Sequence, residues 1–389
     1  MEEEPTHKPA AGDDDGSSIK GPTVTAVVER LANTVDRVRL AAVCTSCRVV
    51  TSPRRVHPWL ILNPWSGDKG KHAYCIEDGT ILSRFCFSNE AVWGRIVGSH
   101  DGGWAAISET PLAKQRSIIR LRPRVSLFVP LKVIFSEPPT SSGCILAAII
   151  GTSGVAICGL GRPKSAWTPQ GFVGTTVLDI AFCNGHLYCL VLETTNIVRF
   201  EVGLTKSGVF KGDPQWLDIQ DRWLYLQGDG DPDERAVYII ELGGKIMIAT
   251  RKKRRWDWRS PNNRGHFFVV FELVDVGHGA YILEHVKSLC DQALFLGPTF
   301  SKAMYVSTCE HGSPQRNHIY YSHHRCYPQK DCLPDDAKVF LTSMDSDGCH
   351  VYYKKDESVD KDEEGITSVG HYVSGGDKYP PMWLFPPDL

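Results

Sequence analysis

The sequence has no excess of charge of either sign, because 43 Lys and Arg residues stand against 45 Asp and Glu residues. A protein that binds nucleic acid over a broad surface needs a basic face to displace counterions, so this balance argues against a nucleic-acid partner. The sequence also contains no Asn-x-Ser/Thr glycosylation site. Residues 1–18 are acidic and polar and have no apolar core of the secretory type, so we expect a disordered tail there.

Long uninterrupted apolar runs are missing as well. The nearest candidate for a membrane span is the uncharged stretch 143–161, but residues 151–154 (Gly-Thr-Ser-Gly) divide it into two short runs. Two short apolar runs around such a turn predict a buried β-hairpin and no membrane partner.

Cysteine is present without a disulfide or zinc pattern. The 13 cysteines are odd in number and scattered, and Cys144, Cys158, Cys183 and Cys189 lie inside apolar runs, where cysteine behaves as a small hydrophobic residue. This usage indicates a reducing compartment, the cytoplasm, the nucleus or both. Cys44-x-x-Cys47 has redox or zinc spacing, but no second pair lies at a fitting distance. The set His311, His323, His324, Cys326 and Cys332 has ligand-type residues but no spacing for a tight site, so we predict no metal and no cofactor.

Catalytic motifs are absent too. Lys69-Gly70-Lys71 lacks the spacing of a phosphate-binding loop, and no G-x-S-x-G motif for a nucleophilic serine occurs. No pair of carboxylates is placed by the sequence for acid–base work. We therefore predict that the protein is not an enzyme and assign no catalytic residue.

Tight turns are abundant, with 35 glycines and 24 prolines. After residue 54, short β-rich runs alternate with turns, as in the pair 177–183 and 186–192 around Asn184-Gly185 and the pair 236–242 and 245–250 around Gly243-Gly244. Strand groups that recur every 40–50 residues or so are typical of propeller blades. The sequence thus predicts an all-β fold over 54–389, a β-propeller of about seven blades, with six possible. A pair of β-sandwiches is the alternative.

Residues 19–53 are the one part that predicts helix. Val28, Leu31, Val35, Val38 and Ala42 are spaced alternately three and four apart, which gives one apolar stripe. Such a stripe is too short to be buried within its own segment, so it must pack on the propeller or on a partner helix. Pro53 ends the segment.

Two charged segments stand out within the β region. The basic run 251–255, followed by Trp256, comes directly after a predicted strand and is interpreted as a solvated hairpin tip. Contact with an acidic partner and a nuclear localisation signal are the alternatives. Residues 356–365 predict an acidic loop.

Residues 29–48 resemble the second half of an F-box, in the order Leu31, Asp36-Arg37, Val38, Leu40, Val43-Cys44 and Arg48. The remainder resembles the F-box-associated domain of plant F-box proteins known as domain of unknown function 295, a KIB-type β-propeller. The resemblance is carried by five segments in a specific order, which are 102–104, 179–188, 288–297, 317–321 and 381–386. Cys290 stands where that family usually has glycine.

The resemblance implies a non-enzymatic substrate receptor of a cullin-RING (SCF-type) ubiquitin ligase. The propeller, 54–389, would bind an unidentified target protein, and its contact residues are not assigned. The degenerate F-box-like helices, 19–53, would bind a Skp-type adaptor and through it the cullin scaffold. The residues expected to bind the adaptor are Val24, Val28, Leu31, Val35, Asp36, Arg37, Val38, Leu40, Val43 and Cys44.

The first helix of the box departs from the motif. Ile19-Lys20 replaces Leu-Pro, Thr23-Val24 replaces Leu-Leu, and Cys47 replaces Trp. Each lost anchor is expected to weaken adaptor binding by about 1–3 kcal/mol. The alternative function is therefore a propeller interaction module whose F-box has decayed and which acts outside the ligase.

Overall fold

The computed structural model describes residues 58–62, 72–76, 81–82, 95–101, 104–108, 118–121, 130–160, 167–172, 175–192, 196–205, 208–220, 236–253, 266–306, 314–322, 338–341, 350–356, 365–374 and 381–385. All of them belong to one compact unit, His57–Pro387. The predicted tail (1–18) and F-box-like helices (19–53) lie outside the described residues. The described residues contain no helix, and hence none with the length and hydropathy needed to cross a bilayer.

The described residues form 27 β-strands in six sheets, which we number along the chain. Sheet 1 is β27 (Met382–Leu384), β1 (Trp59–Leu62), β2 (His72–Cys75), β3 (Ile81–Leu82), and sheet 2 is β4 (Arg95–His100), β5 (Trp104–Ser108), β6 (Ile118–Leu121). Sheet 3 is β7 (Pro130–Phe135), β8 (Ile145–Ile150), β9 (Gly154–Gly159), β10 (Thr168–Gly171). Sheet 4 is β11 (Val177–Cys183), β12 (His186–Val191), β13 (Asn196–Thr205), β14 (Gly208–Lys211), with β15 (Gln215–Trp216) on β13.

The last two sheets are larger. Sheet 5 is β17 (Val237–Leu242), β18 (Lys245–Lys253), β19 (His266–Gly277), β20 (Ala280–Val286), β16 (Asp218–Ile219). Sheet 6 is β22 (Lys302–Tyr305), β21 (Gln292–Leu296), β23 (His318–Ser322), β26 (Thr367–Ser374), β25 (His350–Asp356), β24 (Lys338–Leu341).

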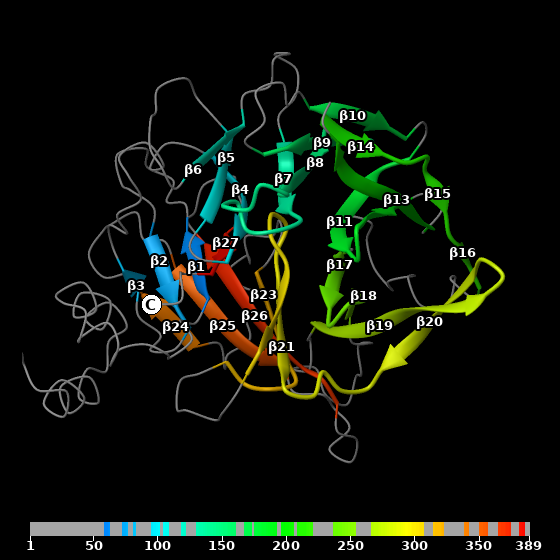
Figure 1. The fold of residues 1–389 in the computed structure, drawn as a ribbon. Helices are drawn as coiled ribbons and strands as arrows, with labels where there is room; N and C mark the ends of the chain where they lie inside the picture. The colour runs from blue at the N-terminus through cyan, green and yellow to red at the C-terminus, as the bar shows by residue number, and fades with distance from the viewer. Residues whose placement is uncertain are drawn as a thin grey trace, which may run out of the picture. The chain divides into compact units, whose positions relative to one another are not determined.

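Figure 1 shows the six sheets following one another in a cyclic order, and buried hydrophobic clusters join neighbouring sheets. Each cluster draws its side chains from consecutive sheets, for example Val97 and Val133 from sheets 2 and 3, Ile157 and Val198 from 3 and 4, Leu190 and Ile248 from 4 and 5, Val270 and Leu294 from 5 and 6, and Phe295 and Trp59 from 6 and 1. The first cluster also includes Ile96 of sheet 2, so the cycle closes. An all-β cycle of this kind is consistent with a β-propeller. The number of blades stays a prediction.

Sheet 1 combines the two ends of the unit. The C-terminal strand β27 pairs antiparallel with β1, in the register Trp59↔Leu384 and Ile61↔Met382. Trp383 is fully buried, its indole N–H donates to the Leu296 carbonyl at 2.9 Å, and its carbonyl accepts a hydrogen bond from Ser99 Oγ. Strand β27 is thus bound to sheets 1, 2 and 6 together.

The predicted tight hairpins are confirmed. Asn184 and Gly185 have φ angles of 48° and 75°, and Gly243 and Gly244 have φ angles of 61° and 80°. Left-handed backbone at both central positions matches the right-handed twist of the paired strands, which is why Asn-Gly and Gly-Gly occur here. The apolar stretch 143–161 is also a hairpin, β8–β9, and almost all of its strand residues are buried.

The strand grouping differs from the sequence prediction in sheet 6. Strands β21, β23 and β26 pair in parallel, whereas the hairpins on which the prediction rests pair their strands antiparallel. Parallel neighbours need a long connection, because the chain must return to the same end of the sheet before the second strand begins. Here more than twenty residues separate the two strands of each parallel pair. Such pairing leaves no local sequence pattern.

The interpretation of the basic run 251–255 as a hairpin tip is wrong for its first residues. Strand β18 continues to Lys253, and Arg251 is 7% exposed with its guanidinium over the Tyr321 ring at 5.8 Å. An arginine stem is apolar and its planar head stacks on aromatic rings, so arginine can extend a buried strand. The remainder of that run lies outside the described residues.

The glycine-to-cysteine departure at Cys290 has a structural cost. Cys290 is exposed and has a φ of 54°, a left-handed backbone that glycine adopts without strain. We expect Cys290→Gly to raise the free energy of unfolding by about 0.5–1 kcal/mol, measured by urea denaturation.

Asn317 provides the matched control for Cys290, since its φ is 57° but its side chain accepts from the Leu289 N–H and donates to the Gly365 carbonyl. Asn317→Gly is therefore expected to lower the free energy of unfolding by about 1–2 kcal/mol, although it removes the same unfavourable backbone conformation. Equal effects of the two substitutions would contradict the explanation.

Candidate protein-interaction surface

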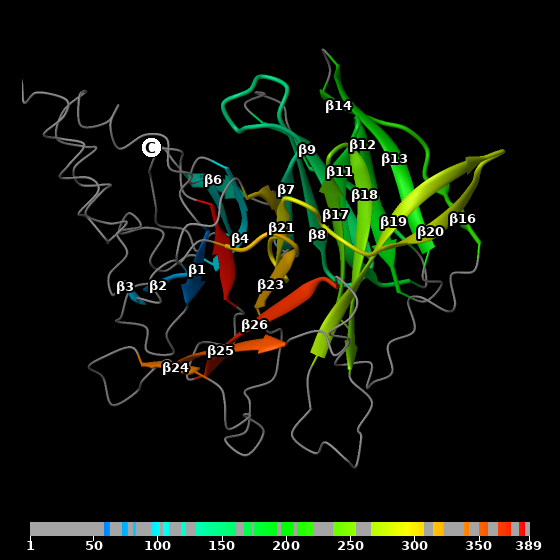
Figure 2. The ribbon, with the colours of Figure 1, turned by 90° about the horizontal axis from the view of Figure 1, so that it is seen from below.

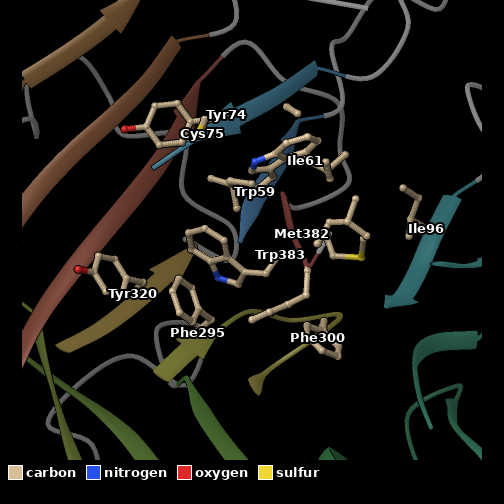
Figure 3. Close-up of a cluster of buried hydrophobic side chains, with 14 of the residues drawn as sticks. Trp59, Ile61, Tyr74, Cys75, Ile96, Phe295, Phe300, Tyr320, Met382 and Trp383 are labelled. Carbon is tan, nitrogen blue, oxygen red and sulfur yellow. The ribbon is translucent and has the colours of Figure 1, made fainter. Parts of the chain in front are cut away.

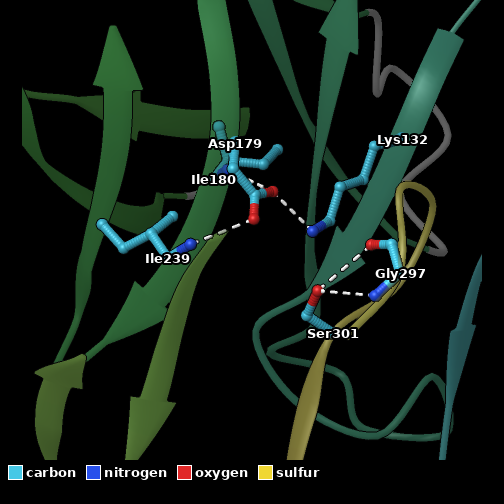
Figure 4. A network of polar contacts seen from close by, with 6 residues as sticks. All are labelled: Lys132, Asp179, Ile180, Ile239, Gly297 and Ser301. Atoms are coloured by element: carbon cyan, nitrogen blue, oxygen red, sulfur yellow. Dashed lines mark hydrogen bonds and ion pairs between the residues drawn. The ribbon is translucent and has the colours of Figure 1, made fainter. Parts of the chain in front are cut away.

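A buried ion pair joins three consecutive sheets (Figure 4). The Lys132 ammonium on β7 donates to Asp179 Oδ1 on β11 at 2.5 Å. The same carboxylate accepts from the backbone N–H of Ile180 at 2.8 Å and, through Oδ2, from the N–H of Ile239 on β17 at 3.0 Å. Strands β7, β11 and β17 are each the first of their sheet, so one carboxylate ties sheets 3, 4 and 5 together.

A local irregularity accompanies each charged residue of this pair. The pairing register shifts between Pro130 and Lys132 in β7 and between Val177 and Asp179 in β11. A β-bulge changes the direction of the side chain that follows it. Both charged residues directly follow such a shift, which accounts for a lysine and an aspartate that meet inside strands composed mainly of apolar residues.

The environment of the pair indicates a structural role. Both side chains are 3% exposed, so no substrate reaches them. Burial raises the pKa of Asp179 above its usual value, and the Lys132 charge and the backbone donors offset part of this effect. Among the described residues, no group of three or more His, Cys, Asp or Glu side chains is placed to hold a metal ion.

A buried histidine, His371, lies against aromatic residues of the hydrophobic cluster that closes the cycle; Figure 3 shows this cluster, with Tyr74, Tyr320 and Trp383 labelled. His371 on β26 is surrounded by the rings of Tyr74, Tyr320 and Trp383 at centroid distances of 5.7, 6.3 and 5.3 Å. Burial lowers the pKa of His371 to about 3, against a hydrogen bond to the Tyr321 backbone that raises it. The imidazole is therefore neutral in the folded protein at physiological pH.

His371 predicts a stability that declines in acid. The unfolded chain binds a proton at a pKa of 6.5 and the folded chain only at about 3, so folding stability is complete above pH 6.5 and is lost as the pH falls between these values. We expect a loss of about 1 kcal/mol between pH 6 and pH 5 from this residue, measured as the pH dependence of urea unfolding.

His371→Phe keeps an aromatic ring and removes the titration, so it is expected to flatten this part of the pH profile. His100, whose pKa burial also lowers, remains in the variant and leaves some slope. An unchanged slope in the variant would show that His371 does not carry the effect.

A groove of about 480 Å³ lies where sheets 3, 4 and 5 present their turns. It is lined by the β7–β8 loop, the Asn184-Gly185 turn, the end of β13 and Glu241 at the end of β17. Three hydrogen bonds hold these walls: Asn184 Nδ2 and Cys183 Sγ donate to the Gly244 carbonyl, and the Gly244 N–H donates to Glu241 at 2.7 Å. A concave surface on turns of a rigid scaffold is a common site of recognition.

The sequence-predicted adaptor residues, from Val24 to Cys44, all lie outside the described residues. No target-binding residue was predicted, and the groove was therefore missed. One signal was available for the ion pair, since Lys132 and Asp179 are single charges within apolar runs and a buried charge requires a partner. No signal in the sequence connects the groove-lining segments, which are far apart along the chain.

The comparison with protein families decides the family. The profile of the KIB1-4 β-propeller family matches residues 42–353, most of the chain. The chain belongs to this family. The KIB-type part of the resemblance noted in the sequence is thereby confirmed, whereas the F-box was not detected by this comparison.

Comparison with individual proteins adds little. No curated protein matches the chain. Among solved structures, the catalytic domain of a β-fructofuranosidase from Microbacterium saccharophilum K-1 is similar over 62% of this chain, with 10% sequence identity and a TM-score of 0.25. The chain spans 60% of that domain, and a likeness this low carries no argument about activity.

Proposed function

We propose that this KIB1-4 family protein is a non-enzymatic substrate receptor of an SCF-type ubiquitin ligase in the cytoplasm or nucleus. Its propeller, predicted to have about seven blades, binds the target protein, and residues 19–53 bind the Skp-type adaptor, which connects it to the cullin. The observation that carries the proposal is the family match that begins at residue 42, directly behind the F-box-like Asp36-Arg37 pattern. This propeller family is found in F-box proteins.

A binding role also agrees with the polar interior. The buried charges Lys132 and Asp179 pair with each other, Asp179 also accepts from two backbone N–H groups, and neither residue lines the groove. The polar side chains that line the groove are the carboxylates of Glu137 and Glu241, the Asn184 amide, the Ser136 hydroxyl and the buried Cys183 thiol, which donates to a backbone carbonyl. Such a surface suits recognition of another chain.

Co-expression with a Skp-type adaptor tests the adaptor role. We expect the full chain to co-purify with the adaptor and Leu31→Asp to abolish the complex, because a charge replaces an apolar anchor in the predicted helix stripe. Trp216→Ala, at a half-exposed position on sheet 4, is the control and should co-purify like the wild type. Equal recovery of the adaptor with wild type and Leu31→Asp would contradict the proposal.

The second candidate, a propeller module with a decayed F-box, follows from Thr23 and Cys47. If Thr23 and Cys47 no longer provide the apolar anchors of the F-box, the wild type does not bind the adaptor. The double variant Thr23→Leu, Cys47→Trp then gains adaptor affinity by about tenfold or more. Strong binding by the wild type would exclude the decayed form.

A further inference from the structure

Strand β13 has an edge that the described strands do not fully use. On one edge it pairs with β12 from Asn196 to Glu201, and on the other it pairs with β15 and β14. The first edge continues beyond β12, where the Val202 N–H donates to the Gly185 carbonyl at 3.0 Å. From Gly203 to Thr205 no strand of the described part of the chain pairs with this edge, while β14 pairs with the opposite one (Figure 2).

The alternation of the strand shows which groups this edge presents. The Gly212 N–H donates to the Glu201 carbonyl at 2.8 Å, so residue 201, and with it Gly203, directs its backbone groups toward β14. Leu204 therefore directs its N–H and C=O the opposite way, toward the same side as the Val202 N–H. A donor and an acceptor are thus available for one more strand.

The open edge borders the groove described above. Val202, Gly203 and Leu204 line the groove together with Ile145 and Phe182, which give it an apolar part. An incoming strand that pairs with Leu204 would direct alternate side chains into the groove. Backbone hydrogen bonds to Leu204 would then contribute affinity and the side-chain contacts in the groove would contribute specificity, as in other cases of strand addition.

The charge of the groove is negative. Its charged side chains are Glu137 and Glu241, and the described residues that line it include no lysine or arginine. Glu137 accepts from the Ser141 hydroxyl, and Glu241 accepts from the Gly244 N–H. These contacts orient the carboxylates, and each carboxylate has about four acceptor sites, so capacity remains for a cationic partner.

We propose that this groove binds an extended basic segment of a partner protein, which adds as a strand to β13 at Leu204. A lysine or arginine of that segment pairs with Glu137 and Glu241, and the apolar stem of the same side chain packs on Phe182 and Ile145. The inference deepens the proposed receptor function and rests on it, since it names the place where a target would be held.

A designed peptide tests the inference on the full chain. We expect the acetylated, amidated and fluorescently labelled peptide TVKVRVT to bind in an anisotropy titration, and its counterpart TVEVEVT not to bind. The double variant Glu137→Gln, Glu241→Gln should weaken binding of the basic peptide by about tenfold. The control Asp218→Asn, Glu284→Gln removes the same charge at exposed positions of sheet 5 and should bind like the wild type.

A backbone-blocked peptide separates strand addition from simple charge attraction. N-methylation of alternate residues along the edge that faces β13 removes the hydrogen bonds and keeps the charges, and methylation along the other edge is its control. We expect only the first to lose binding by tenfold or more. This arm uses wild-type protein, so it does not depend on how a variant folds.

The inference is overturned if TVKVRVT does not bind, if it binds equally to the Glu137/Glu241 variant, or if both methylated peptides bind alike. Co-purification with the adaptor is measured in a separate experiment, which tests the receptor function independently of the groove. Peptide failure with adaptor binding removes the groove site and leaves the receptor function standing, whereas peptide binding without adaptor binding supports the site and removes the ligase role.

Discussion

Asp179→Ala is expected to lower the free energy of unfolding by about 3–5 kcal/mol. The substitution leaves the Lys132 ammonium buried without its carboxylate and removes the acceptor of the Ile180 and Ile239 N–H groups. Unpaired buried charges and unsatisfied donors are among the most costly changes in a core. Urea denaturation followed by tryptophan fluorescence measures the loss.

A double substitution distinguishes the lost charge from lost packing. Asp179→Asn combined with Lys132→Met removes both charges and keeps similar volumes, so it should recover about half or more of the loss. A loss below about 1 kcal/mol for Asp179→Ala would mean that the ion pair does not brace sheets 3, 4 and 5.

Trp383→Ala is expected to lower the free energy of unfolding by about 3–5 kcal/mol. Trp383 is fully buried between sheets 1 and 6, in edge-to-face contact with Phe295 at 5.3 Å, and its indole N–H is bonded to the Leu296 carbonyl. Removing it leaves a cavity at the strand that closes the cycle, and the Leu296 carbonyl loses its indole donor. Thermal unfolding and limited proteolysis near the C-terminus would report the opening.

Trp216 is the matched control, because the same substitution there removes a side chain that is 46% exposed. Trp216→Ala is expected to lower the free energy of unfolding by less than about 1 kcal/mol. Similar losses at both positions would contradict the view that β27 closes the fold.

The local part of the fold could be predicted because it depends on neighbouring residues. Asn184-Gly185 and Gly243-Gly244 specify their turns by backbone conformation, and the strands on either side follow from β-rich composition. These features need no knowledge of distant segments.

The non-local part could not be predicted from residue patterns. The register of β27 against β1 joins residues more than 300 positions apart, and only the family resemblance pointed to segment 381–386. Arg251 has the sequence environment of an exposed tip, and its burial depends on Tyr321 in another sheet. Packing between distant elements overrides local preference in both cases.

The candidate site also has a part that the sequence indicates and a part that depends on distant segments. Lys132 and Asp179 each indicate a buried partner, but the bulges that bring them together are not encoded in any short motif we recognise. The groove depends on the free edge of β13, which exists only because β13 extends beyond His186, the first residue of its antiparallel neighbour β12. A difference in strand length becomes visible only when the sheet is assembled.

Hydrogen–deuterium exchange of the full chain, alone and with a Skp-type adaptor, tests the central claim most directly. The account predicts that the adaptor protects residues 19–48 and leaves exchange in the described sheets unchanged, because the two binding functions occupy different parts of the chain. A saturating adaptor that protects no residue in 19–48, or protects the propeller strands instead, would contradict it.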